Sequence, residues 1–347
     1  MTRVAISGTG AIAERAHIPA LLSVADFQIV ALQSRTLEKA RRVAETIWPD
    51  AGARPAAYDD FAVMLAREKP DAVVILTPNH LHCEYTLAAI AAGAHVLCEK
   101  PMAPNAADAR RMVEAARAAG RVLMVAMQRR YGAIEATVKR ALDAGAIGTA
   151  HFIRARLSHG GPEGWAPGQR WFTTARESGG GAMLDLGVHI ADLAIWYLGA
   201  IAAVDGQVAT LGKQIGVEDT GVAILRFCSG ALGVLEASWS STPGLSAIEI
   251  YGSAGRVMMG YPRNEISILR ADGAEAPGYS RAEIMAAFDP RDLLAPFRAL
   301  AHNFADAIAR RAAPYPDGAD GLRAVEAIDA CYRSARTGAR VELPLGR

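Results

Sequence analysis

Short apolar runs alternate with amphipathic segments through the first 128 residues, and this alternation restricts the fold more than any other feature. The apolar runs cover residues 4–7, 28–33, 72–76, 95–98 and 122–126. The amphipathic segments between them include residues 37–46, 59–67, 82–92 and 106–119. Such an order predicts βαβ units around a parallel sheet. We therefore expect a doubly wound α/β domain over residues 1–128.

The pattern changes in the rest of the chain, residues 129–347. Longer strand-like runs, separated by glycine-rich turns, cover residues 151–158, 201–210, 221–228, 231–240 and 246–251. They predict an open, mainly antiparallel sheet in a second, α+β domain. Two helical segments follow at about 291–311 and 318–336. The pattern leaves open whether these last helices pack on the first domain.

Composition narrows the classes of function. The 347 residues carry a net charge of +1, which gives no electrostatic basis for binding nucleic acid or an anionic membrane. The four cysteines form no CxxC pair and lie in apolar surroundings, as expected of reduced, buried thiols. The longest apolar stretch, 182–204, contains Asp185, His189 and Asp192, which favours a buried helix over a membrane span. A strand-like run begins at residue 3, so we expect no signal peptide and a cytoplasmic protein.

The segment "GTGAIA" at 8–13 has the G-x-G-x-x-A form of a dinucleotide-binding turn. It follows the first predicted strand and opens a helix, which is the context that this short pattern requires. Gly8 allows the tight turn, Gly10 lets the backbone approach a pyrophosphate, and Ala13 permits close helix–strand packing. Ala11 and Ile12 lie where free helix N–H groups would meet the phosphates.

The end of the second predicted strand distinguishes NAD from NADP. NAD-selective sites have an acidic residue there, which binds the ribose 2′-hydroxyl. This chain has "LQSRT" at 32–36 instead, so Arg35 and Ser34 could bind a 2′-phosphate by charge and by hydrogen bond. The alternative is that Arg35 only begins an exposed helix. We predict that NADP is preferred and that NAD is possible.

Two further segments place polar groups where chemistry is expected. In "HVLCEKPM" at 95–102, Glu99 and Lys100 end an apolar strand. Ligands of open α/β sheets bind at the carboxyl ends of strands, which favours a functional role for this segment. The alternative is a plain surface turn, in which charged residues and proline are also common. In "DLGVHIAD" at 185–192, Asp185, His189 and Asp192 share one face if the segment is α-helical. A buried histidine near a capping aspartate would look the same.

The cluster "HLHCE" at 80–84 brings His80, His82 and Cys83 together. Their spacing matches no tetrahedral zinc pattern, so we predict no metal site.

Taken together, these segments resemble the glucose–fructose oxidoreductase / inositol dehydrogenase / MocA (Gfo/Idh/MocA) family. The resemblance rests on "GTGAIA", on "TPNHLH" at 77–82, on "AAGAHVLCEKP" at 91–101, on "GGGAMLDLGVH" at 179–189 and on "SARTGARVELP" at 334–344. It extends over nearly the whole chain. It implies a Rossmann domain joined to an α+β domain whose open sheet often supports oligomers.

The resemblance also implies roles for individual residues. Glu99 and Lys100 would lie beside the nicotinamide, with the Lys100–Pro101 bond cis. His189 would be the proton acceptor in oxidation, because imidazole titrates near neutral pH. Asp185 would bind or orient the substrate, and Lys100 would polarise a substrate hydroxyl. Further cofactor contacts are expected from Thr77, Pro78, Asn79 and His82, and His17 is expected either near the phosphates or in plain packing.

Candidate substrate contacts follow the last strand of the first domain and lie in the first half of the second. They are Arg130, Tyr131, Trp165, Arg170, Trp171 and Asp192. Aromatic and arginine side chains suit a polyhydroxylated ring, which offers C–H faces and many hydroxyls. The same residues would also suit ordinary packing between domains.

These observations predict an NAD(P)-dependent oxidoreductase that transfers a hydride between nicotinamide and a secondary alcohol or carbonyl of a sugar, polyol or related small cyclic compound. The alternatives are a dihydrodiol- or aldose-type dehydrogenase, a cofactor-assisted glycosidase, and a non-catalytic NADP-binding sensor. The intact Lys100, Asp185 and His189 argue against the sensor. We expect a homodimer or homotetramer formed through the sheet of residues 151–260, because a large exposed apolar face is costly.

Overall fold

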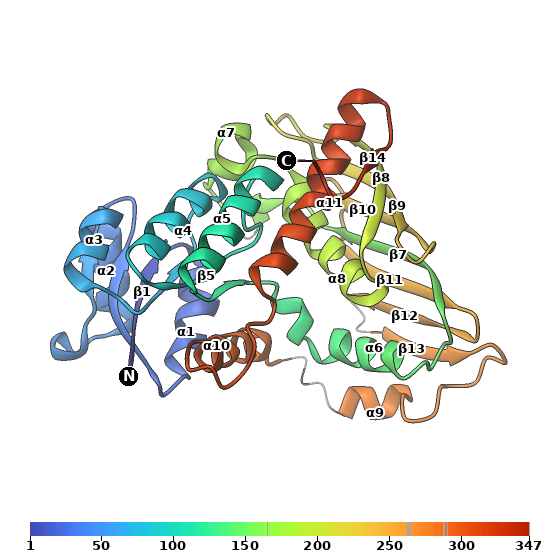
Figure 1. Cartoon of the computed structure of the whole chain (residues 1–347), viewed down its shortest axis with the longest axis horizontal. Helices are drawn as coiled ribbons and strands as arrows, with labels where there is room; N and C mark the ends of the chain where they lie inside the picture. The colour runs from blue at the N-terminus through green and yellow to red at the C-terminus, as the bar shows by residue number, and fades with distance from the viewer. Residues whose placement is uncertain (165, 262–264, 287–288, 290, 347) are drawn as a thin grey trace. The chain divides into compact units, whose positions relative to one another are not determined.

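The computed structural model describes every residue except 165, 262–264, 287–288, 290 and 347. The chain forms two compact units (Figure 1). Unit 1 contains Met1–Gln128 and Leu294–Leu322, and unit 2 contains Arg129–Leu293 and Arg323–Arg347. The segment with the first of the two late helices thus belongs to unit 1, and most of the last helix belongs to unit 2.

Unit 1 is built on a six-stranded sheet in the order β3-β2-β1-β4-β5-β6. All of its strand pairs are parallel. The strands are β1 (Thr2–Ser7), β2 (Phe27–Gln33), β3 (Ala56–Tyr58), β4 (Ala72–Ile75), β5 (His95–Cys98) and β6 (Leu123–Val125). The helices are α1 (Ile18–Leu22), α2 (Leu37–Ile47), α3 (Phe61–Glu68), α4 (His82–Ala91), α5 (Ala106–Ala119) and α10 (Ala295–Ile308). This is the doubly wound Rossmann arrangement that the sequence predicts.

Side-chain caps explain where several of these helices begin. Asp60 accepts a hydrogen bond from the Val63 amide at 2.8 Å, and Asn105 accepts one from the Asp108 amide at 2.9 Å. Each cap satisfies an N–H group that has no partner within the helix. In Figure 1, α4 and α5 lie side by side, and α10 packs on α1.

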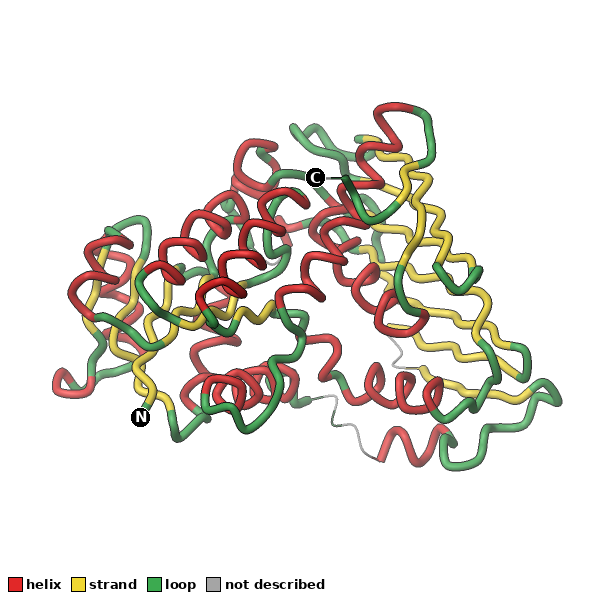
Figure 2. The backbone as a smooth tube through the Cα atoms, in the orientation of Figure 1, coloured by secondary structure: helices red, strands yellow, loops and turns green. Residues whose placement is uncertain are grey.

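Unit 2 is built on an eight-stranded sheet in the order β13-β12-β11-β7-β10-β9-β8-β14. Figure 2 shows its strands as one continuous layer. The strands are β7 (Ala150–Ser158), β8 (Ile201–Ala209), β9 (Thr220–Phe227), β10 (Leu232–Ser238), β11 (Leu245–Gly252), β12 (Gly255–Tyr261), β13 (Glu265–Arg270) and β14 (Val341–Glu342). β7 and β10 are parallel and the other pairs are antiparallel. The mainly antiparallel sheet is confirmed.

The helices of unit 2 are α6 (Ala133–Asp143), α7 (Ala175–Ser178), α8 (Val188–Leu198), α9 (Arg281–Ala286) and the main part of α11 (Gly318–Thr337). Helix α8 packs against β7 and β10, and nearly all of its residues are buried. The helical stretch Ala175–Leu198 is long and apolar enough to cross a membrane, but 83% of its most apolar window is buried within the protein. The structure thus uses this stretch as a core helix, as its internal Asp and His residues predict.

Candidate active-site elements

The glycine-rich turn of unit 1 follows β1 and leaves room for a ligand. Gly8 has φ +99°, and a side chain there would collide with the carbonyl group of Leu76. At Gly10, an added Cβ would meet no other atom within 4 Å. Ile12, which follows this turn, is 37% exposed. An open backbone beside an exposed apolar side chain fits a dinucleotide.

The chain after this turn enters a π-helical turn, Ala13–His17, before α1 begins. Single π-turns within helices occur often at functional sites. Here the turn ends at His17, which is 2% exposed and lies edge-on to Phe297 of α10 with ring centroids 5.3 Å apart. His17 is therefore fixed in the core of unit 1 and aimed at the segment that follows β5.

The segment after β5 carries Lys100, and buried groups hold it on both sides. The His17 Nε2 atom lies 2.7 Å from Glu99 Oε1, and the Lys100 backbone N–H donates to Glu99 Oε2 at 2.8 Å. The Lys100–Pro101 peptide bond is cis, as the family resemblance implies. Burial alone would raise the pKa of Glu99, but its hydrogen bond and charge interaction with His17, together with Lys100, hold the pKa below its usual value. Glu99 is thus a buried carboxylate that stays ionised at neutral pH.

His82 holds the other side of the same turn. Its Nδ1 atom lies 2.8 Å from the Pro101 carbonyl oxygen, and its Nε2 atom lies 2.8 Å from the Thr77 carbonyl oxygen. The ring is 1% exposed and links the ends of β4 and β5. Burial lowers the pKa of His82, while the two carbonyl contacts act in the opposite direction. Its predicted cofactor contact stays a prediction, and the geometry favours an indirect role.

Thr77 follows β4 and gives an independent indication of a ligand. Its Oγ1 atom is buried and has no hydrogen-bond partner among the described residues. A buried hydroxyl without a partner costs free energy unless a ligand or water supplies one. Asn79, two residues later, is also buried, whereas Pro78 is half-buried. Thr77 and Gly10 therefore fit a bound dinucleotide.

The end of β2 carries the residues predicted to choose between cofactors. Ser34 is 4% exposed, and its Oγ atom accepts a hydrogen bond from Thr9 Oγ1 at 2.8 Å. Arg35 is exposed and forms no ion pair with a described residue. A phosphate at this position would meet the exposed Arg35 guanidinium, and the buried Ser34 hydroxyl, which accepts from Thr9, keeps its own O–H to donate.

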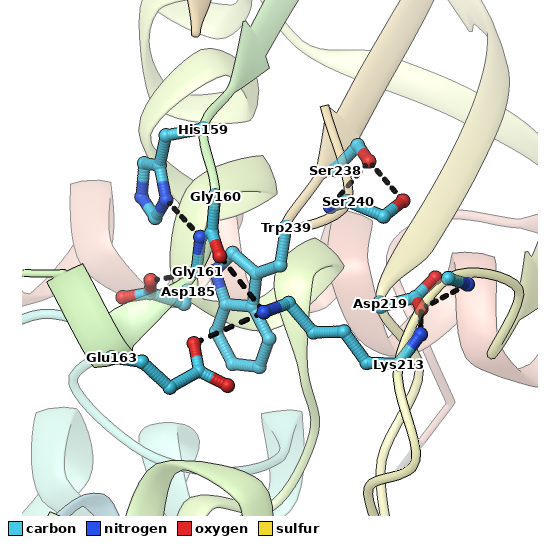
Figure 3. Close-up of polar contacts among 11 residues, drawn as sticks. His159, Gly160, Gly161, Glu163, Asp185, Lys213, Asp219, Ser238, Trp239 and Ser240 are labelled. Carbon is cyan, nitrogen blue, oxygen red and sulfur yellow. Dashed lines mark hydrogen bonds and ion pairs between the residues drawn. The ribbon is translucent and has the colours of Figure 1, made fainter. Parts of the chain in front are cut away.

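In unit 2, Asp185 and His189 lie on a helix that changes its winding between them. Met183–Gly187 forms a π-helical turn, and α8 begins at Val188. The expectation of a shared face assumed a regular α-helix, and the winding at Asp185 is π-helical instead. Both side chains are nevertheless at least nine-tenths buried. The Trp239 indole N–H donates to Asp185 Oδ2 at 3.3 Å, which fixes the orientation of that carboxylate (Figure 3).

A loop near these residues is held by a second carboxylate. Asp219 accepts hydrogen bonds from the backbone N–H groups of Leu211, Gly212 and Lys213 at 2.7 to 3.0 Å. The Lys213 ammonium then donates to the Gly160 carbonyl oxygen at 2.8 Å and to Glu163 Oε2 at 3.1 Å. Figure 3 shows this network beside Trp239 and Asp185. The loop after β7 is therefore tied to the loop after β8.

The structure brings together some of the predicted substrate residues but not others. Arg130 and Asp192 form a buried ion pair with a closest approach of 2.6 Å, and the Arg130 guanidinium lies 5.7 Å from the Trp196 ring centroid. This pairing favours a structural role for both. Arg170 is exposed, Tyr131 is half-buried and Trp171 stacks on Phe172 at 3.7 Å. Trp165 lies outside the described residues. Their substrate contacts stay predictions.

No group of three metal-ligating side chains occurs among the residues that the structure describes. His80 is exposed, whereas His82 and Cys83 are buried and engage backbone oxygens. Burial raises the pKa of the Cys83 thiol to about 11, so it is not a thiolate at neutral pH.

Sequence reasoning missed the supporting residues. Trp239 is separated from Asp185 by 54 positions, and no local pattern connects the two residues. His17 was found, but its pairing with Glu99 was not expected. The signal that could have found this pairing is that both residues are polar and buried, since such a residue is rarely buried without a partner.

The fold and these elements define a dinucleotide-dependent oxidoreductase. Residues 2–127 match the model "Oxidoreductase family, NAD-binding Rossmann fold", and residues 136–258 match the "GFO/IDH/MocA C-terminal domain". The chain belongs to the Gfo/Idh/MocA family of oxidoreductases and binds NAD(H) through its Rossmann domain.

Named relatives and solved structures agree with this assignment. The chain is 34% identical over 286 residues to the 1,5-anhydro-D-fructose reductase of Ensifer adhaerens, with 80% of each chain covered. It is 29% identical over 361 residues to the D-glucoside 3-dehydrogenase of Escherichia coli, with 98% of this chain and 97% of that one covered. The WlbA dehydrogenase of Bordetella pertussis, solved with NADH and UDP-GlcNAcA, has a TM-score of 0.88 at 30% identity, with 99% and 98% covered. The chain is thus similar to dehydrogenases over nearly its whole length and to a reductase over 80% of it.

Proposed function

We propose that the protein transfers a hydride between a nicotinamide and a secondary alcohol or carbonyl of a sugar, polyol or related small cyclic compound. The observation that carries the proposal is the arrangement around Lys100. An ammonium at a strand end, with its turn held by Glu99 on one side and by His82 on the other, is preorganised to donate to a substrate oxygen. The names of the relatives, which are sugar and polyol dehydrogenases and reductases, support the substrate class.

The proposed reaction divides the work between cofactor and protein. The nicotinamide, when bound, accepts the hydride from the carbinol carbon. His189 takes the proton of the same hydroxyl, so that a carbonyl is left, and it returns the proton in reduction. Asp185, oriented by Trp239, binds the substrate, and Lys100 stabilises negative charge on the reacting oxygen. Gly10 and Thr77 would hold the dinucleotide.

The choice of cofactor is a finer proposal. Arg35 is exposed at the end of β2, and the acid typical of NAD-selective sites is missing there. We propose a preference for NADP(H), with the Arg35 guanidinium binding the 2′-phosphate.

We also propose that the protein is a cytoplasmic homodimer or homotetramer, formed through the outer face of the unit 2 sheet. Four large apolar side chains on this face, those of Val222, Ile224, Leu232 and Met258, are 39 to 53% exposed. A second copy would cover them. We expect Ile224→Arg to lower the mass measured by light scattering, and Leu211→Arg, in an exposed loop, to leave it unchanged. A monomeric wild type at micromolar concentration would contradict the proposal.

The proposed activity is tested with a panel of sugars, polyols, cyclic sugar derivatives and dihydrodiols. Reduction of NAD⁺ and NADP⁺ is followed by the absorbance of the reduced nicotinamide. We expect at least one polyhydroxylated substrate to be oxidised, and its ketone to be reduced in the reverse assay. Tight cofactor binding without turnover on any member would overturn the proposal in favour of a sensor.

A further inference from the structure

Three amide groups begin the helix that carries Asp185 and His189, and one residue accepts hydrogen bonds from all of them. The Glu218 carboxylate accepts from the Gly181 N–H at 2.9 Å and from the Met183 N–H at 3.0 Å. The Glu218 backbone carbonyl accepts from the Ala182 N–H at 3.0 Å. Glu218 thus caps this helix from 35 positions further along the chain, where helices normally use a residue next to their first turn.

The glycines before this helix are explained by the same contact. A side chain at Gly181 would collide with the Glu218 carbonyl oxygen, and one at Gly180 would collide with the Tyr332 hydroxyl. The Tyr332 hydroxyl itself donates to Glu218 Oε1 at 2.7 Å. Burial and the neighbouring Glu218 hold the pKa of Tyr332 well above its usual value, so it remains a neutral donor. The "GGG" segment therefore gives Glu218 and Tyr332 access to the start of the helix.

Asp219, the residue after Glu218, is connected to Asp185 through Trp239. The Asp219 carbonyl oxygen accepts the Trp239 backbone N–H at 2.7 Å, and the Trp239 indole N–H donates to Asp185 Oδ2. The Asp185 backbone N–H in turn donates to the Gly181 carbonyl oxygen at 2.9 Å. The two residues Glu218 and Asp219 thus hold Asp185 through its backbone and through its side chain.

We propose that Glu218 is a positioning residue for Asp185 and His189. It sets the start of the π-turn Met183–Gly187, and therefore the direction in which the two side chains leave the helix. The inference rests on the proposed function, since it assumes that Asp185 and His189 act on the substrate. Small displacements of reacting groups cost a large part of the rate.

The test compares Glu218→Gln, Tyr332→Phe and the control Glu342→Gln. Glu342 is exposed in the same unit and pairs with Arg226. We expect Glu218→Gln to lower kcat between about 10- and 100-fold below its melting temperature, with the cofactor Kd unchanged. Tyr332→Phe keeps the carboxylate and should have a smaller effect in the same direction. The control should have wild-type kinetics.

A second readout does not depend on activity. The indole N–H resonance of Trp239, assigned with Trp239→Phe, reports on the hydrogen bond to Asp185. We expect it to move in Glu218→Gln and, less, in Tyr332→Phe, but not in the control. This measurement tests whether Glu218 positions Asp185 even if no substrate turns over and the proposed function fails. If Glu218→Gln does not fold, Tyr332→Phe decides alone. A lower Tm with unchanged kcat and unchanged indole resonance would mean that Glu218 is only a helix cap, and would overturn the proposal.

Discussion

Glu99 in unit 1 and Glu218 in unit 2 are both about nine-tenths buried, yet their pKa values are displaced in opposite directions. Glu99 contacts the His17 imidazole and lies next to Lys100, which outweigh burial and lower its pKa. Burial raises the pKa of Glu218, because the Tyr332 hydroxyl and the backbone amides offset only part of it. The charge of a buried carboxylate therefore depends on whether its partners carry charge or only dipoles.

The two units also share a structural feature, a π-helical turn that carries a buried polar side chain. Among the residues that the structure describes, each unit contains a π-helical turn, at Ala13–His17 in unit 1 and at Met183–Gly187 in unit 2. In each, a buried polar side chain of the π-turn, His17 or Asp185, is engaged by a residue distant in sequence. The units differ in what this contact supports: in the first it fixes Glu99 beside Lys100, and in the second it fixes Asp185 on the helix that also carries His189. The predictions below remove or test one side of this comparison at a time.

Removal of the proton acceptor in unit 2 has the largest expected effect. His189→Ala should lower kcat about 10²- to 10⁴-fold, the usual contribution of a general base. Steady-state kinetics measure the loss. His302→Ala, at an exposed position of α10, is the control. Wild-type turnover in His189→Ala would show that His189 is not the proton acceptor.

Removal of the donor in unit 1 is expected to cost slightly less. Lys100→Met should lower kcat, because the activation free energy should rise by about 3–4 kcal/mol, the usual contribution of a preorganised donor to an oxyanion. Cofactor Kd and Tm should stay close to wild type, because the His17–Glu99 hydrogen bond and the bond from the residue-100 backbone N–H to Glu99 are kept. Lys69→Met, at an exposed position, is the control. If Lys100 only belongs to a surface turn, the kinetics of the variant will be normal.

Arg35→Ala tests the cofactor side of unit 1. Loss of a charge-assisted hydrogen bond to the 2′-phosphate should weaken NADPH binding by about 1.5–3 kcal/mol. NADH, which lacks that phosphate, should bind as before. Fluorescence titration of both cofactors gives the two Kd values, with Arg41→Ala of α2 as the control. Tighter binding of NADH than of NADPH by the wild type would show that the preference is reversed.

The pH dependence of the free energy of unfolding should distinguish Glu99 from Glu218. This is the smallest effect that we predict. The folded-state pKa of Glu99 is lowered, so its stabilising contribution is present above the unfolded pKa of about 4.5 and is lost as the pH falls through the folded value. The folded-state pKa of Glu218 is raised, so its contribution is present below about 4.5 and is lost as the pH rises through the folded value.

Thermal melts of Glu99→Gln and Glu218→Gln beside wild type, over the acidic range, measure this difference. Acidification should reduce the advantage of wild type over Glu99→Gln and increase its advantage over Glu218→Gln. One pH unit of pKa difference corresponds to about 1.4 kcal/mol. If acidification changed the stability advantage of wild type in the same direction for both variants, the opposite pKa displacements of Glu99 and Glu218 would be contradicted.

Regular elements could be predicted because their signals are local. The strand 95–98 and the helix 106–119 have the bounds that the sequence predicts. Strand β3, with three residues, is too short to show a period. The pattern also did not resolve β12, which follows β11 through a tight turn, or β13. Helix α6 was also missed. The parallel pairing of β7 with β10 depends on tertiary order, which alternation does not encode.

The candidate site could be predicted only in its local parts. Gly8, Lys100 and His189 stand in recognisable segments, whereas the groups that hold them come from elsewhere in the chain. The contacts of His17 with Glu99 and of Glu218 with Met183 span 82 and 35 positions. Their partners are set by packing, so that a single sequence contains no pattern for them. The π-turns are also invisible, because their spacing differs from α-helical spacing by one residue.

The central claim is that Lys100 and His189 are each needed for the proposed hydride transfer, and a single-turnover experiment tests it most directly. Enzyme saturated with oxidised cofactor is mixed with an excess of an active polyol, and reduced nicotinamide is followed in wild type, Lys100→Met and His189→Ala. The account predicts rapid reduction in wild type and a loss of at least about 100-fold in each variant, with the cofactor still bound. A wild-type rate of reduction in either variant would contradict it.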